Sequence, residues 1–128
     1  MHCHKRFVII LFLASLQPLG CHADYLNEAD AASYLLQKIN KTKVYDWTIP
    51  ECLSFYTQDA TKQYFDISIH ELHNNKCSGD QGTFPVIDRF RIYRAGDKTH
   101  KVLWQDLAID RFLPFKKFVE SRKNKLQR

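Results

Sequence analysis

Hydrophobic spacing divides the chain into a helical part and a strand-forming part. Within residues 27–40 apolar side chains recur every three or four positions, which is typical of an amphipathic helix. The expected buried stripe consists of Ala32, Leu35, Leu36 and Ile39. Asn27 stands where an N-cap is needed, and Glu28 and Asp30 suit the positive end of a helix dipole. Residues 27–40 are therefore predicted to form a helix.

Two later stretches, 63–72 and 86–94, alternate between apolar and polar residues as half-buried strands do. The predicted core side carries Phe65, Ile67, Ile69 and Glu71 from the first stretch and Asp88, Phe90 and Ile92 from the second. Apolar runs at 52–57 and 102–109 predict two further strands, and residues 111–119 close the body of the domain.

One helix followed by about four locally connected strands predicts an α+β fold. We expect the N-terminal helix to pack on one face of a curled antiparallel sheet, in the element order shared by cystatin-like and NTF2-like rolls. Such rolls host unrelated activities, so the fold analogy assigns no function.

The first 23 residues have the three-part layout of a secretory signal peptide. Lys5 and Arg6 precede an apolar run at 7–16, and Ala23 offers a small residue for cleavage. The run of about ten residues is too short to cross a bilayer, which needs about 20. These features predict a signal peptide at 1–23, no transmembrane span, and export to the bacterial periplasm or the extracellular space.

An alternative to simple cleavage arises at Cys21, which follows Gly20 as the lipidated cysteine of a bacterial lipoprotein follows a small residue. A lipid there would anchor the protein to a membrane surface without spanning it. Removal of residues 1–23 leaves one domain, predicted at 24–115.

Positive charge is concentrated at the C-terminal end. Residues 116–128 contain six lysine or arginine residues against the single acid Glu120, whereas residues 24–115 are slightly acidic. The net charge of +5 therefore reflects a basic tail at 116–128 and the signal peptide, and not a basic domain. Nucleic-acid binding, which needs a basic face interleaved with aromatic residues, is not favoured. Contact of the tail with an anionic envelope surface stays open.

Cys52 and Cys77 are the two cysteines that remain after residue 23. In an exported protein two cysteines most simply form one disulfide, and no CxxC spacing points to a metal instead. His70 and His73 are three residues apart on a predicted strand, so they face opposite ways and do not reproduce the helical HExxH zinc motif. We therefore predict no metal site and no cofactor, and we assign no catalytic residue.

A pair of carboxylates is the first candidate site. If the stretches 63–72 and 86–94 pair with each other, one register sets Ile69 opposite Phe90 and Glu71 opposite Asp88. Two carboxylates that close would raise the pKa of one of them, as in acid/base pairs. The alternative is that Glu71 and Asp88 are satisfied separately at the rim of the sheet.

The opposite face of the same strands is the second candidate site. It carries His70, Arg89, Arg91 and Tyr93, together with Asp66 and Ser68. Arginine beside tyrosine is common at protein interfaces, which makes this a candidate binding face. A solvated face with cross-strand ion pairs is the alternative.

The loop between these strands contains residues that specify turns. Gly79 and Gly82 tolerate positive φ, Asp80 can close an Asx-turn, and Pro85 favours extended backbone at the residue before it. We expect these residues to have an architectural role.

The run Cys77-x-Gly79-Asp80-x-x-Thr83-x-Pro85-x-x-Asp88-x-Phe90-Arg91-Ile92 resembles a signature of small exported bacterial proteins of uncharacterised function. The stretches "CLSFYT" at 52–57 and "FDISIHELH" at 65–73 have counterparts in that family, so the resemblance spans about residues 28–110. It implies a periplasmic or secreted helix-plus-sheet protein and carries over no catalytic residue.

These features favour a small exported protein that works by binding, as an inhibitor-type or immunity-type module. Its expected partner is another protein or an envelope component. Two alternatives stay open. One is a roll-shaped enzyme with a pocket built from His70, Glu71, Asp88 and Arg89. The other is a structural accessory of an envelope assembly.

Overall fold

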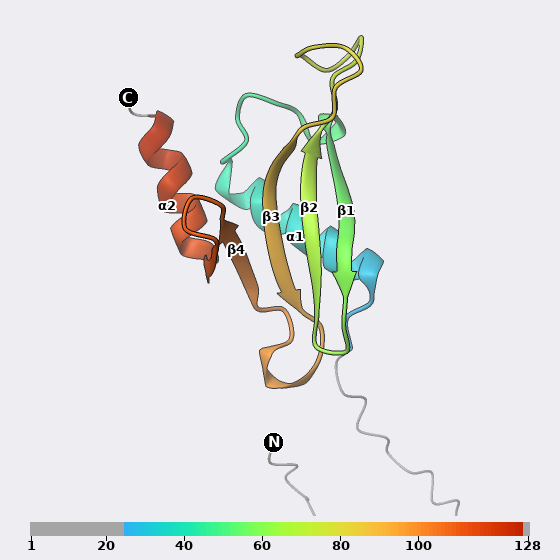
Figure 1. The fold of residues 1–128 in the computed structure, drawn as a ribbon, viewed down its shortest axis with the longest axis vertical. Coiled ribbons are helices and arrows are strands. Elements are labelled where there is room, and N and C mark those ends of the chain that lie inside the picture. Colours follow the sequence, from blue (N-terminus) through green and yellow to red (C-terminus); the bar gives the residue numbers. More distant parts are fainter. Residues whose placement is uncertain (1–24, 127–128) are drawn as a thin grey trace, which may run out of the picture.

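The computed structural model describes residues 25–126 of the chain (Figure 1). The predicted signal peptide at 1–23 and the alternative lipidation site at Cys21 lie outside the described residues. Within residues 25–126 no helix is long and apolar enough to cross a membrane.

The elements follow one another as a helix, a five-stranded meander and a second helix. Their bounds are α1 Glu28–Thr42, β1 Leu53–Ala60, β2 Tyr64–Glu71, β3 Val86–Tyr93, β4 Val102–Asp106, β5 Arg111–Pro114 and α2 Phe115–Leu126, with short 3-10 turns at Pro50–Cys52 and Gly96–Lys98. All neighbouring strands are antiparallel and the sheet order is β1-β2-β3-β4-β5. The predicted α+β class with a helix on an antiparallel sheet is confirmed.

The local sequence accounts for both ends of α1. The side chain of Asn27 accepts a hydrogen bond from the backbone N–H of Asp30 at 2.9 Å, which is the predicted N-cap. Lys43 ends the helix in a left-handed conformation with φ of 53°. The fully buried stripe is Ala31, Leu35 and Ile39, while the predicted members Ala32 and Leu36 lie half-buried beside it.

The hydrophobic core lies between the sheet and both helices, on one face of the sheet. Figure 1 shows α1 crossing behind β1, β2 and β3, while the near face of these strands carries no helix. The sheet contributes Phe65, Ile67 and Ile69 from β2 and Phe90 and Ile92 from β3, all of them almost completely buried. The face that these residues occupy is called the inner face below, and the uncovered one the outer face.

The stretch 102–109 was predicted as one strand, but β4 ends at Asp106. The side chain of Asp106 accepts a hydrogen bond from the backbone N–H of Ala108, and Asp110 has a positive φ of 48°. These features close a turn, and the chain returns as β5. The sheet therefore has five strands where we expected about four.

The C-terminal segment, which was expected to form a basic tail at 116–128, is helical as far as Leu126. Phe118 anchors α2, because its side chain is completely buried and its ring lies 5.0 Å from that of Phe90. Lys116 and Lys117 lie on the exposed side of α2 and form ion pairs with Glu120. The many charged residues of this segment made its apolar stripe, by which the helix packs, hard to recognise in the sequence.

The predicted pairing of β2 with β3 is wrong by two residues. Ile67 lies opposite Phe90, and Ile69 lies opposite Asp88, so Glu71 is not the cross-strand partner of Asp88. A bulge between Ile69 and His70 shifts the register near the loop. The connection of residues 72–85 is too long for its turn geometry to fix the register of β2 and β3. Side-chain packing determines that register instead.

Cys52 and Cys77 form the predicted disulfide, which joins the start of β1 to the loop that follows β2. The bond closes a loop with a sequence separation of 25 residues. On the chain-entropy model, the Cys52→Ala/Cys77→Ala variant should lose about 3.5 kcal/mol of unfolding free energy. Urea titration of both proteins measures this difference, and a loss below about 1 kcal/mol would contradict it.

Candidate functional site

The outer face holds the residues of the predicted binding face in neighbouring positions. Tyr93 pairs with Tyr64, Arg91 with Asp66, and Arg89 with Ser68 across β2 and β3. His70 follows on β2, beyond Ser68 on the same face. The structure thus brings His70, Arg89, Arg91 and Tyr93 onto one uncovered surface of the sheet (Figure 1).

Arg91 is fully engaged by its neighbours on this face. Its Nε and Nη2 atoms donate hydrogen bonds of 2.7 and 2.8 Å to the two carboxylate oxygens of Asp66. Its guanidinium carbon also lies 3.7 Å from the ring centroid of Tyr64 and 4.2 Å from that of Phe112. The hydrogen bond with Asp66 raises the pKa of Arg91 above its ordinary value. Arg91 therefore has a structural role, because it joins β2, β3 and the Phe112 side chain of β5 on the outer face.

His70 is also held by neighbours. Its Nδ1 atom lies 3.2 Å from the carbonyl oxygen of Phe84, which can only accept, so Nδ1 carries a proton. Its Nε2 atom lies 2.9 Å from the hydroxyl of Ser68. This serine–histidine contact has the composition of a nucleophile and its base. Only 1% of Ser68 is exposed, however, and Gln58 donates a hydrogen bond to its hydroxyl, so a substrate has no access to it.

Arg89 differs from both of these residues. It is exposed, and within residues 25–126 no hydrogen bond, ion pair or ring contact joins its side chain to another residue. It lines a hollow of about 170 Å³ on the outer face. The other lining residues are Gln58, Asp59, Asp66, Ile67, Phe90, Gln105 and Phe112.

The second predicted site, the pair of Glu71 and Asp88, is not formed. Asp88 points to the inner face, where 3% of it is exposed. It accepts hydrogen bonds from Tyr45 Oη at 2.6 Å, Trp104 Nε1 at 2.9 Å and Arg122 Nη2 at 2.6 Å. These donors come from the segment after α1, from β4 and from α2. Asp88 therefore joins separate elements of the fold, and the shifted register removes Glu71 from its reach.

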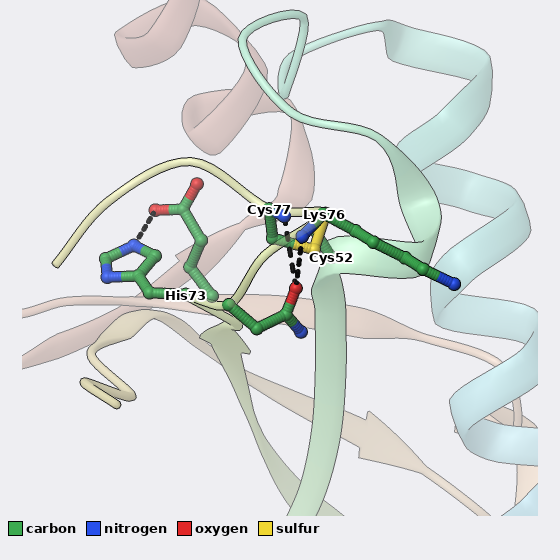
Figure 2. The surroundings of a disulfide bond; sticks show 6 residues. Cys52, His73, Lys76 and Cys77 are labelled. Atoms are coloured by element: carbon green, nitrogen blue, oxygen red, sulfur yellow. Dashed lines mark hydrogen bonds and ion pairs between the residues drawn. A yellow bond between two sulfur atoms is a disulfide. The ribbon is translucent and has the colours of Figure 1, made fainter. Parts of the chain in front are cut away.

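Glu71 is paired with His73 instead, at the end of β2 near the disulfide. Figure 2 shows the side chain of His73 and the Cys52–Cys77 bond at this end of the sheet. His73 Nε2 lies 3.4 Å from the carboxylate of Glu71, and Nδ1 lies 2.6 Å from the hydroxyl of Thr83. That hydroxyl donates to the carbonyl oxygen of Asp80, so it accepts from Nδ1. The contact with Glu71 is thus an ion pair when the imidazole is protonated.

The loop residues have the expected architectural roles, with one exception. Gly79 and Gly82 have φ values of 117° and 80°, and β3 begins directly after Pro85. A β-carbon at Gly79 would lie 2.4 Å from the ring of His73, so this position has no room for a side chain. The exception is Asp80, which contributes its backbone carbonyl and forms no Asx-turn through its carboxylate.

Asn74 makes the side-chain turn that was predicted for Asp80. Its Oδ1 atom accepts hydrogen bonds from the backbone N–H groups of Lys76 and Cys77. These contacts position Cys77 for the disulfide, as Figure 2 shows beside the labelled Lys76. An asparagine three residues before a cysteine in a polar loop is the sequence signal that could have identified it.

Several residues that shape the two sites were not predicted. Gln58, Gln105 and Phe112 surround Arg89, and Tyr45, Trp104 and Arg122 surround Asp88. They come from parts of the chain other than β2 and β3, so the alternation within those two strands does not identify them. Among residues 25–126 no group of three or more histidine, cysteine or acidic side chains is placed to hold a metal ion.

Comparisons with protein-family models, with curated proteins and with solved structures gave no match to this chain. The resemblance to a family of small exported bacterial proteins therefore stays an expectation that rests on the run from Cys77 to Ile92.

Replacement of Asp88 tests its structural role. Asp88→Asn removes the charge that faces Arg122, and we expect it to lower the unfolding free energy by about 3 kcal/mol, as loss of one partner of a buried pair does. The matched control is Asp66→Asn, which breaks the more exposed pair with Arg91 and should cost at most about 1 kcal/mol. Urea titration measures both; equal losses would contradict the distinction.

Tyr45 provides a second test, through pH. Burial, and then the neighbouring Asp88 carboxylate, raise the pKa of Tyr45 above its ordinary value of 10.0. Above about pH 10 the unfolded chain releases this proton while the folded chain keeps it, so stability should fall as pH rises, by up to about 1.4 kcal/mol per pH unit. The Tyr45→Phe variant should lack this part of the decline. Parallel stability curves for the two proteins between about pH 9 and 11 would contradict the assignment.

Proposed function

We propose that this protein is a non-enzymatic binding module of the inhibitor or immunity type, which engages a partner protein through the outer face of its sheet. The observation that supports this proposal is that helices cover only one face of the sheet. Both helices pack on the inner face, and the outer face presents Arg89 together with exposed Tyr56 and Phe84. Arginine and aromatic side chains on one open surface are typical of protein interfaces.

Export to the bacterial periplasm or the extracellular space is the second part of the proposal. A disulfide forms and persists in an oxidising compartment, and Cys52 and Cys77 form one here. The layout of residues 1–23 supports the same location, because it has the three parts of a secretory signal peptide. The partner would then be a secreted enzyme, a toxin or a protein of the envelope.

A roll-shaped enzyme is less well supported. The pocket expected for it needs His70, Glu71, Asp88 and Arg89 to converge, but Asp88 faces the inner side of β3 and Arg89 the outer side. Glu71 and His70 are also occupied by separate partners. The remaining alternative, a structural accessory of an envelope assembly, predicts contacts over α2 in place of the outer face.

Site-specific photocrosslinking in a bacterial periplasm tests the proposed face. A photoreactive phenylalanine analogue replaces Gln58 or Val86 on the outer face, and in matched controls it replaces Gln37 of α1 or Asn124 of α2, which are also exposed. We expect a discrete adduct with another protein from the two outer-face positions and none from the two helix positions.

Two results of this experiment would contradict the proposal. Adducts from Asn124 alone would favour an accessory that docks through α2. The absence of adducts from all four positions, in a protein that accumulates normally, would exclude a stable partner at the outer face.

A further inference from the structure

We propose that Arg89 is the anchor of the outer face and binds one side-chain carboxylate, from an aspartate or glutamate of the partner protein. This inference rests on the proposed function and specifies the chemistry of the partner. Its ligand enters the hollow of about 170 Å³ between β1 and β5. The proposal is argued below from the pairing of Arg89, the shape of the hollow, its charge and its surroundings.

Arg89 makes no ion pair within the described residues, whereas polar side chains beside it on β2 and β3 do have partners. On the same face Arg91 is bound by Asp66, and the hydroxyl of Ser68 is bound by Gln58 and His70. Arg89 has no such contact within the described part of the chain. Its planar guanidinium presents donors in the fork geometry that matches a carboxylate.

The hollow forms because side chains from both edges of the sheet lean over its centre. Gln58 of β1 reaches Ser68 on β2, and Phe112 of β5 reaches Arg91 on β3. Arg89 lies between these two walls. A water molecule occupies about 30 Å³ of liquid, so the hollow has room for several waters, enough for a carboxylate and one or two methylene groups.

The charges around the hollow limit Arg89 to one negative group. Asp66 lines it but is neutralised by its two hydrogen bonds with Arg91. Asp59, on the bulged part of β1, carries a negative charge that no described ion pair neutralises. With Arg89 and Asp59 together the hollow has no net positive charge, so Arg89 binds a single carboxylate through its paired N–H donors, whereas Asp59 repels a phosphate dianion or a polyanion.

The surroundings favour a protein as the source of the carboxylate. Tyr56 and Phe84 are 44% and 40% exposed, and Val86 beside them is 40% exposed. The ring of Tyr56 contacts that of Phe84 at 5.5 Å between centroids. An acidic side chain flanked by apolar residues would pair with Arg89 and cover this apolar group in the same encounter, which a free carboxylate ion would not do.

A pair of blocked tripeptides tests the inference. The probes are N-acetyl-Leu-Glu-Leu-amide and its neutral counterpart N-acetyl-Leu-Gln-Leu-amide, titrated into the ¹⁵N-labelled mature protein and followed by NMR. We expect the Glu peptide to shift the signals of Ser68, Arg89 and Gln105, and to bind at least about tenfold more tightly than the Gln peptide. Loss of one charged hydrogen-bonded pair corresponds to a factor of this size.

Two variants with the same change of charge make the test specific. Arg89→Gln should weaken binding of the Glu peptide about tenfold. Arg111→Gln removes an exposed arginine of the same sheet that does not line the hollow, and it should leave the affinity unchanged. Equal affinities for the two peptides, equal effects of the two variants, or tighter binding of inorganic phosphate than of the Glu peptide would each overturn the inference.

The crosslinking experiment distinguishes a failure of this inference from a failure of the proposed function. If adducts from Gln58 persist undiminished in the Arg89→Gln background, the outer face binds a partner but Arg89 is not its anchor. If that background abolishes the adduct while Arg111→Gln preserves it, the anchor role is supported. If no adduct forms in the otherwise unchanged protein, the proposed function itself is wrong.

Discussion

The arrangement of helices and strands in this protein depends on the hydrogen bonds and the ion pair of the buried Asp88 carboxylate. A buried ionised group is costly unless it is paired and hydrogen-bonded, and Asp88 meets that condition with three donors. Tyr45, Trp104 and Arg122 lie far apart in the sequence and come from three different parts of the fold. The carboxylate can be satisfied only when the segment after α1, the strand β4 and the helix α2 have all reached their places. Asp88 therefore links local folding to the tertiary arrangement.

This link decides which face of the sheet remains open. Arg122 reaches Asp88 only if α2 lies on the inner face, where Phe118 of the same helix also contributes to the core. With both helices on one side, the outer face has to be stabilised by its own side chains. Arg91 with Asp66 and its two aromatic neighbours, and Ser68 with Gln58 and His70, provide such contacts. Arg89 stands out because the same face leaves it unpaired.

The parts of the fold that depend on short-range patterns could be predicted from the sequence. Alternation identified the inner and outer sides of β2 and β3, including Asp88 on the inner side and Arg89 on the outer side. The N-cap at Asn27 and the disulfide also followed from residue type and context. The register could not be predicted, because the bulge near His70 and the long loop before β3 depend on packing. Helix α2 was missed because its anchor Phe118 stands among charged residues.

The central claim is that the pair of Asp88 and Arg122 holds α2 on the inner face and so leaves the outer face free. A double-mutant cycle with Asp88→Asn and Arg122→Gln measures this coupling most directly, with the unfolding free energy as the observable. Residues in one buried network typically couple by about 0.5–3 kcal/mol, and we predict a value in the upper half of that range. Effects that add to within about 0.5 kcal/mol would show that the two residues act independently and would contradict the account.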